Sequence, residues 1–286
     1  MPPALRLLRP ANLVLSLAAV AVGGALARGA AAFGAPHLGP LMLAMVVGAL
    51  VGSASNADND VLDVEIDRVN RPDRPVTSGA VTPAGARMMW LSLTALALLL
   101  AVAVSVDVAA LAAASAVLLG AYNRWLKGLP LVGNVAVAAV IAAAPLLGAL
   151  AVEAVPPAVV AAVTLTFGIA LAREMTKDVE DTVGDAAAGA RTLPVVWGEG
   201  RAAWAAVVVI GATVAGLPLA VALGVERSFL AYVVGAALCL LAAAWVLAVG
   251  TVARGSVLRR SATRARQWLK AGMVAGVIAL LATALG

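Results

Sequence analysis

Apolar runs of membrane-spanning length dominate this chain and limit what it can fold into. A helix needs roughly 20 mainly apolar residues to cross the hydrocarbon core of a bilayer. Such runs recur along the whole 286-residue chain, in which only 12% of the residues are charged, against about 25% in typical soluble domains. The sequence therefore predicts an all-α, multi-pass membrane protein that forms a single domain over residues 1–286. Its nine transmembrane helices are expected at residues 12–33, 38–55, 88–104, 107–122, 131–151, 157–172, 202–222, 228–250 and 268–285.

Basic residues indicate which side of the membrane each loop faces, because cytoplasmic loops carry an excess of Lys and Arg. Alternate loops between the nine spans, with the N-terminus, hold all but two of the 20 Lys and Arg; the exceptions are Arg28 and Arg227. This asymmetry supports the span count as well as the orientation. We expect a cell-membrane protein with a cytoplasmic N-terminus and an external C-terminus. The basic residues form no continuous soluble face, so no nucleic-acid partner is expected.

Acidic residues gather in two segments that follow the second and sixth predicted spans. The first segment covers residues 56–67 and the second covers residues 174–185, both on the predicted cytoplasmic side. Within each segment, polar residues recur at intervals of three or four, which places them on one face of a helix. In the first segment these residues are Asn59, Asp63 and Asp67, with Asp60 close to the same face, and in the second they are Asp178, Asp181 and Asp185.

Stacked carboxylates of this kind need a cation or an aqueous cavity. They repel one another, and each costs about 2.5–3.5 kcal/mol near the centre of a span on insertion scales. Mg²⁺ prefers oxygen ligands and commonly bridges carboxylates to substrate phosphates. No His or Cys lies in either segment, so zinc and copper are not expected. Arg and Lys residues are interleaved with these carboxylates. Together, the carboxylates and the basic residues predict a Mg²⁺-dependent diphosphate site. For one segment alone, a solvated acidic face is the simpler alternative.

The two segments occupy equivalent places in two halves of the chain, each after the second of four spans. Membrane proteins built from repeated halves commonly place their site between them. We therefore expect the Asp63 and Asp181 carboxylates to face each other across one pocket at the inner leaflet. They should lie close enough to hold a metal-bound diphosphate.

Small residues provide a further signal for packing. The chain contains 27 glycines, and two pairs of them are four residues apart, Gly48 with Gly52 and Gly272 with Gly276. This spacing fits the small-residue pattern that lets membrane helices approach closely. We interpret both pairs as packing positions.

The acidic segments resemble those of a known family. The pattern Asn59-Asp60-x-x-Asp63-x-x-x-Asp67 is similar to the first signature of the UbiA family of intramembrane prenyltransferases, and Asp178-x-x-Asp181-x-x-x-Asp185 is similar to the second. The resemblance covers nearly the whole chain. It implies nine helices around a central cavity, an active site on the cytoplasmic side and Mg²⁺ as the cofactor.

The resemblance also implies roles for individual residues. The metal ligands would be Asn59, Asp60, Asp63, Asp67, Asp178, Asp181 and Asp185. The catalytic residues would be Asp63, Asp67, Asp181, Asp185 and Lys127. The substrate-binding residues would be Arg9, Asn12, Asn56, Arg71, Arg74, Tyr122, Lys127 and Lys177, with the cations on a diphosphate or on the acceptor's phosphate. Arg9, Arg71 and Lys127 have a plainer interpretation, as basic residues that only mark the cytoplasmic side. Tyr122 likewise has a plainer interpretation, as an aromatic residue at the membrane interface.

The residues that flank the signatures are most similar to archaeal family members that act on glyceryl phosphate ethers. The implied reaction transfers geranylgeranyl from geranylgeranyl diphosphate to the free hydroxyl of 3-O-geranylgeranylglyceryl phosphate, which makes the second ether bond of archaeal membrane lipids. The expected partners are thus a prenyl diphosphate, a lipid-like acceptor and membrane lipid. Two alternatives stay open. One is an aromatic acceptor of the quinone or chlorophyll type, and the other is a cation transporter with acidic sites.

Overall fold

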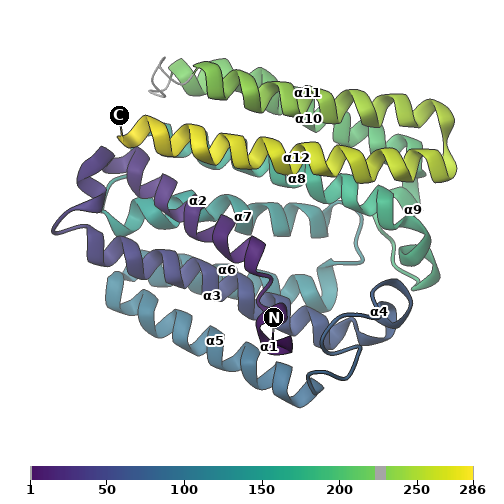
Figure 1. Cartoon of the computed structure of the whole chain (residues 1–286), viewed down its shortest axis with the longest axis horizontal. Coiled ribbons are helices and arrows are strands. Elements are labelled where there is room, and N and C mark those ends of the chain that lie inside the picture. Colours follow the sequence, from purple (N-terminus) through teal and green to yellow (C-terminus); the bar gives the residue numbers. More distant parts are fainter. Residues whose placement is uncertain (1, 223–229, 286) are drawn as a thin grey trace. The chain divides into compact units, whose positions relative to one another are not determined.

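The computed structural model describes residues 2–222 and 230–285, which are all-helical with no strand among them (Figure 1). This confirms the predicted all-α fold. A 3-10 helix covers Gly29–Phe33 and a π-helical turn covers Tyr122–Leu126. The α-helices are α1 (Pro3–Leu7), α2 (Pro10–Arg28), α3 (Leu38–Leu62), α4 (Val64–Asn70), α5 (Pro83–Val104), α6 (Val106–Ala121), α7 (Val132–Ala151), α8 (Pro157–Ala187), α9 (Leu193–Trp197), α10 (Glu199–Ala222), α11 (Leu230–Ala253) and α12 (Gly255–Leu285).

Eight helical segments of the described chain are long and apolar enough to cross a membrane. They are Pro10–Phe33, Leu38–Leu62, Pro83–Val104, Val106–Leu126, Val132–Ala151, Pro157–Ala187, Glu199–Pro218 and Ala236–Ala253. These segments correspond to the first eight predicted spans, although the prediction at 228–250 begins at residues outside those described. The ninth predicted span, 268–285, lies in α12, which is not among the eight. The count of nine therefore stays a prediction.

The break between the third and fourth predicted spans is made by Ser105. Its backbone is extended (φ −169°, ψ 165°), and its hydroxyl accepts a hydrogen bond from the N–H of Val108 at 3.1 Å. A serine in this position satisfies one of the N–H groups that a helix leaves unpaired at its start. Asp107, at which the prediction placed the break, lies in the first turn of α6. A negative charge there interacts favourably with the helix dipole.

Several helices extend beyond the predicted spans. The helix predicted at 38–55 continues to Leu62 and the one predicted at 157–172 continues to Ala187, so most of both acidic segments is helical. The predicted basic loop before the ninth span is wrong, since α12 already begins at Gly255. Charged residues end a membrane span, but Arg, Lys and Glu are good helix formers and do not end a helix.

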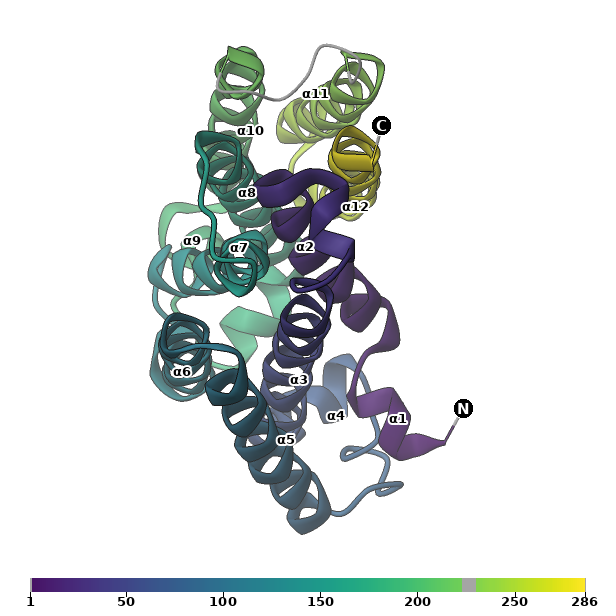
Figure 2. The same ribbon diagram turned by 90° about the vertical axis from the view of Figure 1, so that its left-hand side faces the viewer.

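The helices form two compact units. The first comprises Met1–Trp125 and Ala143–Ala154, and the second comprises Leu126–Ala142 and Val155–Gly286. In the first unit, α3 contacts α2, α5 and α6, and it lies beside α5 in Figure 2. In the second unit, α8 contacts α10 and α12, and α11 contacts the same two helices.

Glycines bring α2 against the C-terminal half of α7 in the first unit. A Cβ added to Gly148 would lie 1.9 Å from the carbonyl oxygen of Val20, and one added to Gly23 would lie 1.7 Å from that of Pro145. The backbones of the two helices are therefore in direct contact, which requires glycine at both positions.

The glycine pairs predicted to pack do so only in part. Gly48 approaches Val20, with 3.1 Å from an added Cβ to Cγ2, and Gly272 approaches the Cβ of Cys239 at 3.4 Å. Within the described part of the chain, no atom lies within 4 Å of a Cβ added to Gly52 or Gly276. The prediction therefore holds for one glycine of each pair.

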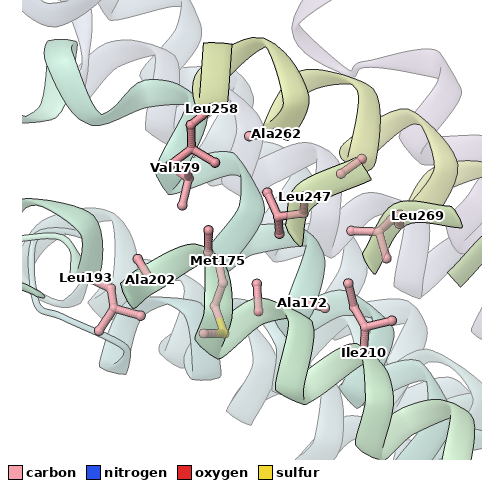
Figure 3. Close-up of a cluster of buried hydrophobic side chains, with 14 of the residues drawn as sticks. Ala172, Met175, Val179, Leu193, Ala202, Ile210, Leu247, Leu258, Ala262 and Leu269 are labelled. Carbon is pink, nitrogen blue, oxygen red and sulfur yellow. The ribbon is translucent and has the colours of Figure 1, made fainter. Parts of the chain in front are cut away.

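The core of the second unit fixes the rotation of α8 (Figure 3). Ala172, Met175 and Val179 of α8 pack against side chains of α10, α11 and α12 that include Ile210 and Leu247. At about 100° per residue, these three α8 residues lie on one side of the helix. The acidic residues of the second segment, Asp178, Asp181 and Asp185, are rotated around the helix from this packed face by about 120° on average.

Candidate active site

The first acidic segment runs from the end of α3 into α4, with Asp63 at the junction. The N–H of Asp63 donates to the carbonyl of Asn59 at 2.9 Å, and the N–H of Asp67 donates to the carbonyl of Asp63 at 2.8 Å. The three residues therefore follow one another at successive helical turns. Asp60, Asp63 and Asp67 are all buried. Because a buried carboxylate is costly without a counter-charge or hydrogen bonds, this segment needs cationic partners.

Two arginines from outside α3 and α4 supply positive charge. Arg9 donates from Nη2 to Asp60 Oδ1 at 2.8 Å. Arg74 lies 3.2 Å from the same oxygen through Nη1, which also donates to Asp67 Oδ2. The Arg74 side chain is only 14% exposed. The structure thus brings four predicted site residues together in one ion-pair network in the first unit.

The backbone of Arg9 is in the left-handed region, with φ 50° and ψ 73°. This conformation is unfavourable for a residue with a Cβ, and such strain is concentrated at functional sites. Burial lowers the pKa of Arg9, the charge of Arg74 acts in the same direction, and Asp60 opposes both. Burial raises the pKa of Asp67, and the nearby Arg74 lowers it in part. Each charge in the network is therefore partly offset by a neighbour of the opposite sign.

Asp58 has a different set of partners, which the sequence analysis missed. Arg124 donates to both of its oxygens, from Nη1 to Oδ2 at 2.7 Å and from Nη2 to Oδ1 at 3.0 Å. Asn123 donates from Nδ2 to Asp58 Oδ2 at 3.1 Å. The sequence offered one signal that Asp58 has a separate role: it does not share the helical face of Asn59, Asp63 and Asp67.

The second acidic segment is wholly helical, because α8 continues to Ala187. Asn134, near the start of α7, donates from Nδ2 to Asp178 Oδ2 at 2.8 Å. The Thr192 hydroxyl donates to Asp185 Oδ2 at 3.0 Å. Side chains of neighbouring segments therefore orient two of the three predicted ligands of this segment, and sequence reasoning assigned no role to either donor.

The two glutamates of the second segment have basic partners within the same unit. Glu174 Oε1 lies 2.9 Å from Arg173 Nη1, and Glu174 Oε2 lies 3.9 Å from Lys177 Nζ. Glu180 pairs with Arg266 of α12, at 3.1 Å to Nε and 3.2 Å to Nη2. Their charges are thus matched inside the second unit, in agreement with their omission from the predicted ligand set.

The remaining predicted site residues lie at helix ends and in short connections. In the first unit, Asn12 is exposed in the first turn of α2, Asn56 is partly buried in α3, Arg71 follows α4 and Tyr122 opens the π turn. In the second unit, Lys127 follows the π turn and Lys177 lies in α8. Asp63 and Asp181 belong to different units, so the pocket expected between them stays a prediction.

The donor chemistry of both segments fits Mg²⁺. All their candidate ligands are carboxylates and one amide, which are the oxygen donors that Mg²⁺ prefers. Over residues 2–222 and 230–285, no three His, Cys, Asp or Glu side chains are grouped closely enough to hold an ion by themselves. Mg²⁺ usually keeps several waters and is bound by one or two carboxylates together with substrate phosphates. The residues present therefore suit a metal that binds with its phosphate substrate.

Comparison with known families decides the assignment. A model of the UbiA prenyltransferase family matches residues 16–284. The chain belongs to the UbiA prenyltransferase family. The resemblance carried by the two acidic segments is thereby confirmed, and with it the interpretation as a prenyltransferase. Together with the candidate spans, family membership identifies an integral membrane protein.

Individual relatives share nearly the full length of the chain. The digeranylgeranylglyceryl phosphate synthase of Methanopyrus kandleri is 38% identical over 284 residues, which is 98% of each chain. A solved structure of a digeranylgeranylglyceryl phosphate synthase has a TM-score of 0.78 and 24% identity, covering 99% of this chain and 98% of its own. A UbiA homologue from Archaeoglobus fulgidus, solved with GPP and Mg²⁺, has a TM-score of 0.72 and 19% identity, with 96% and 99% covered. Because both solved structures are less than 25% identical to this chain, they establish only that it shares their fold.

Proposed function

We propose that this enzyme transfers a geranylgeranyl group from geranylgeranyl diphosphate to the free hydroxyl of 3-O-geranylgeranylglyceryl phosphate. The observation that carries the proposal is the 38% identity, over 98% of both chains, to a relative named for the product of this reaction. The two acidic segments add a chemical argument, since their residues suit the recognition of a metal-bound diphosphate. The two compact units would then act as one catalytic domain.

The proposed metal ligands come from both acidic segments, with Asp63 and Asp181 as the central residues. When bound, Mg²⁺ would neutralise charge that develops on the departing diphosphate. The support for Mg²⁺ is the oxygen-only donor set and the A. fulgidus homologue solved with this ion. Asn134 and Thr192, which donate to Asp178 and Asp185, would hold those carboxylates in a fixed orientation for the metal.

Cationic side chains would stabilise the same leaving group. Arg71, Lys127 and Lys177 are the proposed contacts to the diphosphate or to the phosphate of the acceptor. Preorganised donors of this kind stabilise the charge that develops in the transition state. Arg9 and Arg74 form ion pairs with Asp60 and Asp67, and we assign them to orienting these carboxylates and balancing their negative charge.

The reaction breaks the bond between C1 of the prenyl chain and the diphosphate oxygen. Pyrophosphate leaves with the bonding electrons, and the allylic cation that results is attacked by the acceptor hydroxyl. A new C1–O ether bond forms, and the hydroxyl proton is released. Because a neutral hydroxyl that attacks a carbocation needs little assistance from a base, the principal work of the site is the stabilisation of pyrophosphate.

We further propose that nine helices cross the cell membrane, with the active site and the N-terminus on the cytoplasmic side. All but two of the 20 Lys and Arg fall on that side of the predicted topology. Cysteine accessibility tests this orientation. A cysteine introduced at exposed Arg87 should react only with reagents that reach the cytoplasm, and one introduced at exposed Asp107 only with external reagents.

An acceptor assay with purified enzyme tests the proposed reaction. Labelled geranylgeranyl diphosphate is supplied with 3-O-geranylgeranylglyceryl phosphate or with aromatic acceptors of the quinone and chlorophyll type. The expected product is the diether, formed only with Mg²⁺. Prenylation of an aromatic acceptor in preference to the glyceryl phosphate would replace the proposed substrate. Ion flux in liposomes without pyrophosphate release would overturn the enzymatic assignment of the site.

Substitutions test the site itself. Asp63→Ala and Asp181→Ala should each lower kcat at least about a hundredfold, since each removes part of the stabilisation of the leaving group. Asp107→Ala is the matched control, because Asp107 is an exposed carboxylate in the first turn of α6 and is part of neither acidic segment. It should keep wild-type activity. Near-normal turnover by both site variants, with normal membrane insertion, would refute the assignment of the two segments.

A further inference from the structure

The turn after α6 has an unusual backbone. Residues Tyr122–Leu126 form a π-helical turn, and the N–H of Tyr122 is shared between the carbonyls of Leu118 and Leu119. Such turns are rare, and they frequently occur at functional sites. A π turn is wider than an α-helical turn and has poorer intrinsic stability, so contacts from elsewhere in the fold must hold it in place.

Arg124 supplies the strongest of these contacts. Its guanidinium forms two parallel hydrogen bonds with Asp58 of α3, at 2.7 and 3.0 Å. The same group lies over the Trp90 ring of α5, with 4.8 Å from Cζ to the ring centroid. A bidentate pair fixes direction as well as distance, and the aromatic face adds a cation–π attraction. The π turn is thereby fastened to two helices of the first unit.

Asn123 strengthens the same attachment. Its Nδ2 donates to Asp58 Oδ2 at 3.1 Å and to the carbonyl of Ser55 at 3.2 Å. Asn123 and Asp58 are buried, with 9% and 3% of their surfaces exposed. Both consecutive residues of the π turn thus contact one turn of α3. Asp58 is fully engaged by these partners, although it lies directly before Asn59 in the first acidic segment.

We infer that Asp58 and Arg124 are a positioning pair for the prenyl-transfer reaction. They hold the π turn against α3 and so fix the place of Tyr122, which opens the turn. In one respect the inference rests on the proposed function, because Tyr122 is a proposed substrate-binding residue. The pair links the helix that carries Asn59 and Asp60 to the turn that carries Tyr122. Neither Asp58 nor Arg124 needs to contact the substrate or the metal.

The decisive variant is the double substitution Asp58→Asn with Arg124→Gln. Each single substitution leaves one charged partner without its counter-ion, which costs stability in a buried site whatever its role. The double variant removes both charges and keeps amide groups that can form hydrogen bonds. The double variant should therefore melt at a temperature closer to the wild-type value than either single variant does. Arg87→Gln, at an exposed arginine of α5, is the control for loss of a positive charge.

Kinetics separate positioning from metal binding. The double variant should lose at least about tenfold in kcat, because small displacements of positioning groups have effects of this size or more. The KM for geranylgeranyl diphosphate and the Mg²⁺ concentration for half-maximal activity should stay within about twofold of wild type. A wild-type kcat in the double variant would overturn the inference. A rise of tenfold or more in the Mg²⁺ requirement would instead make Asp58 a metal ligand.

Hydrogen exchange provides a readout that does not depend on the acceptor. Backbone amides of residues 122–126 should exchange faster in the double variant than in wild type or in Arg87→Gln. Unchanged exchange would overturn the inference even if activity falls. If the wild-type enzyme does not use 3-O-geranylgeranylglyceryl phosphate, the proposed function fails, and the positioning pair is then judged by this exchange measurement.

Discussion

Replacing Gly148 by alanine should force α2 and α7 apart. The added Cβ would lie 1.9 Å from the carbonyl oxygen of Val20 and 3.0 Å from the backbone nitrogen of Gly24. Carbon–oxygen contacts are normally no closer than about 3.3 Å, so the Val20 carbonyl must move by about 1.4 Å. The obstructing atoms belong to the backbone, and no side-chain rotation can relieve the clash. Either α2 or the C-terminal half of α7 must shift.

The cost of this shift can be set against the gain from alanine. Overpacking of a close-packed interior costs about 1–3 kcal/mol, and the upper end applies here because a backbone must move. Alanine is better than glycine in a helix by about 1 kcal/mol. The expected net loss is about 2 kcal/mol, which for a chain of this size lowers the melting temperature by about 4–8 °C.

Thermal unfolding in detergent, followed by helical circular dichroism, measures this loss. Gly52→Ala is the matched control, because Gly52 lies in the neighbouring α3 and an added Cβ there meets no described atom within 4 Å. This control should melt at or slightly above the wild-type temperature. If Gly148→Ala melts no lower than Gly52→Ala, the inferred backbone contact between α2 and α7 is refuted.

Two substitutions test the partners of the acidic residues. Asn134→Ala removes the donor to Asp178 Oδ2 and should raise the Mg²⁺ concentration for half-maximal activity by about tenfold or more; an unchanged Mg²⁺ titration would show that this hydrogen bond is not used. Arg74→Gln leaves the buried carboxylates of Asp60 and Asp67 with less positive charge and should cost roughly 3 kcal/mol of stability. Mg²⁺ would replace part of the lost positive charge, so it should raise the melting temperature of Arg74→Gln by more than it raises that of wild type. An equal rise in both would contradict the view that Arg74 balances the charge of these carboxylates.

The sequence was sufficient to predict the helices because each signal is local. Apolar runs located eight membrane-spanning candidates, and the interval of three or four residues placed Asp178, Asp181 and Asp185 on one side of α8. The ends of the helices were less predictable. Six basic residues between 251 and 270 favoured a loop, yet all except Arg254 lie in α12, because Arg and Lys propagate a helix as well as most residues do.

The partners of the site residues depend on contacts between distant segments. Asp60 is 51 residues from Arg9, and Asp58 is 66 residues from Arg124. No spacing rule within one helix connects such pairs, since they depend on how α3 packs against α2 and α6. The acidic segments therefore revealed the candidate ligands, whereas the residues that orient or neutralise those carboxylates required the structure.

The length of α8 has an entropic consequence. Its 31 residues extend for about 46 Å, some 16 Å more than the hydrocarbon core of a bilayer. The turns that carry Asp178 to Asp185 are thus a rigid continuation of the helix. Ordering a flexible loop costs about 1–2 kcal/mol for each residue, and here that cost is met during folding. A diphosphate bound at the proposed site would then require no disorder-to-order transition in these turns, and more of its interaction energy would remain for cleavage of the allylic bond.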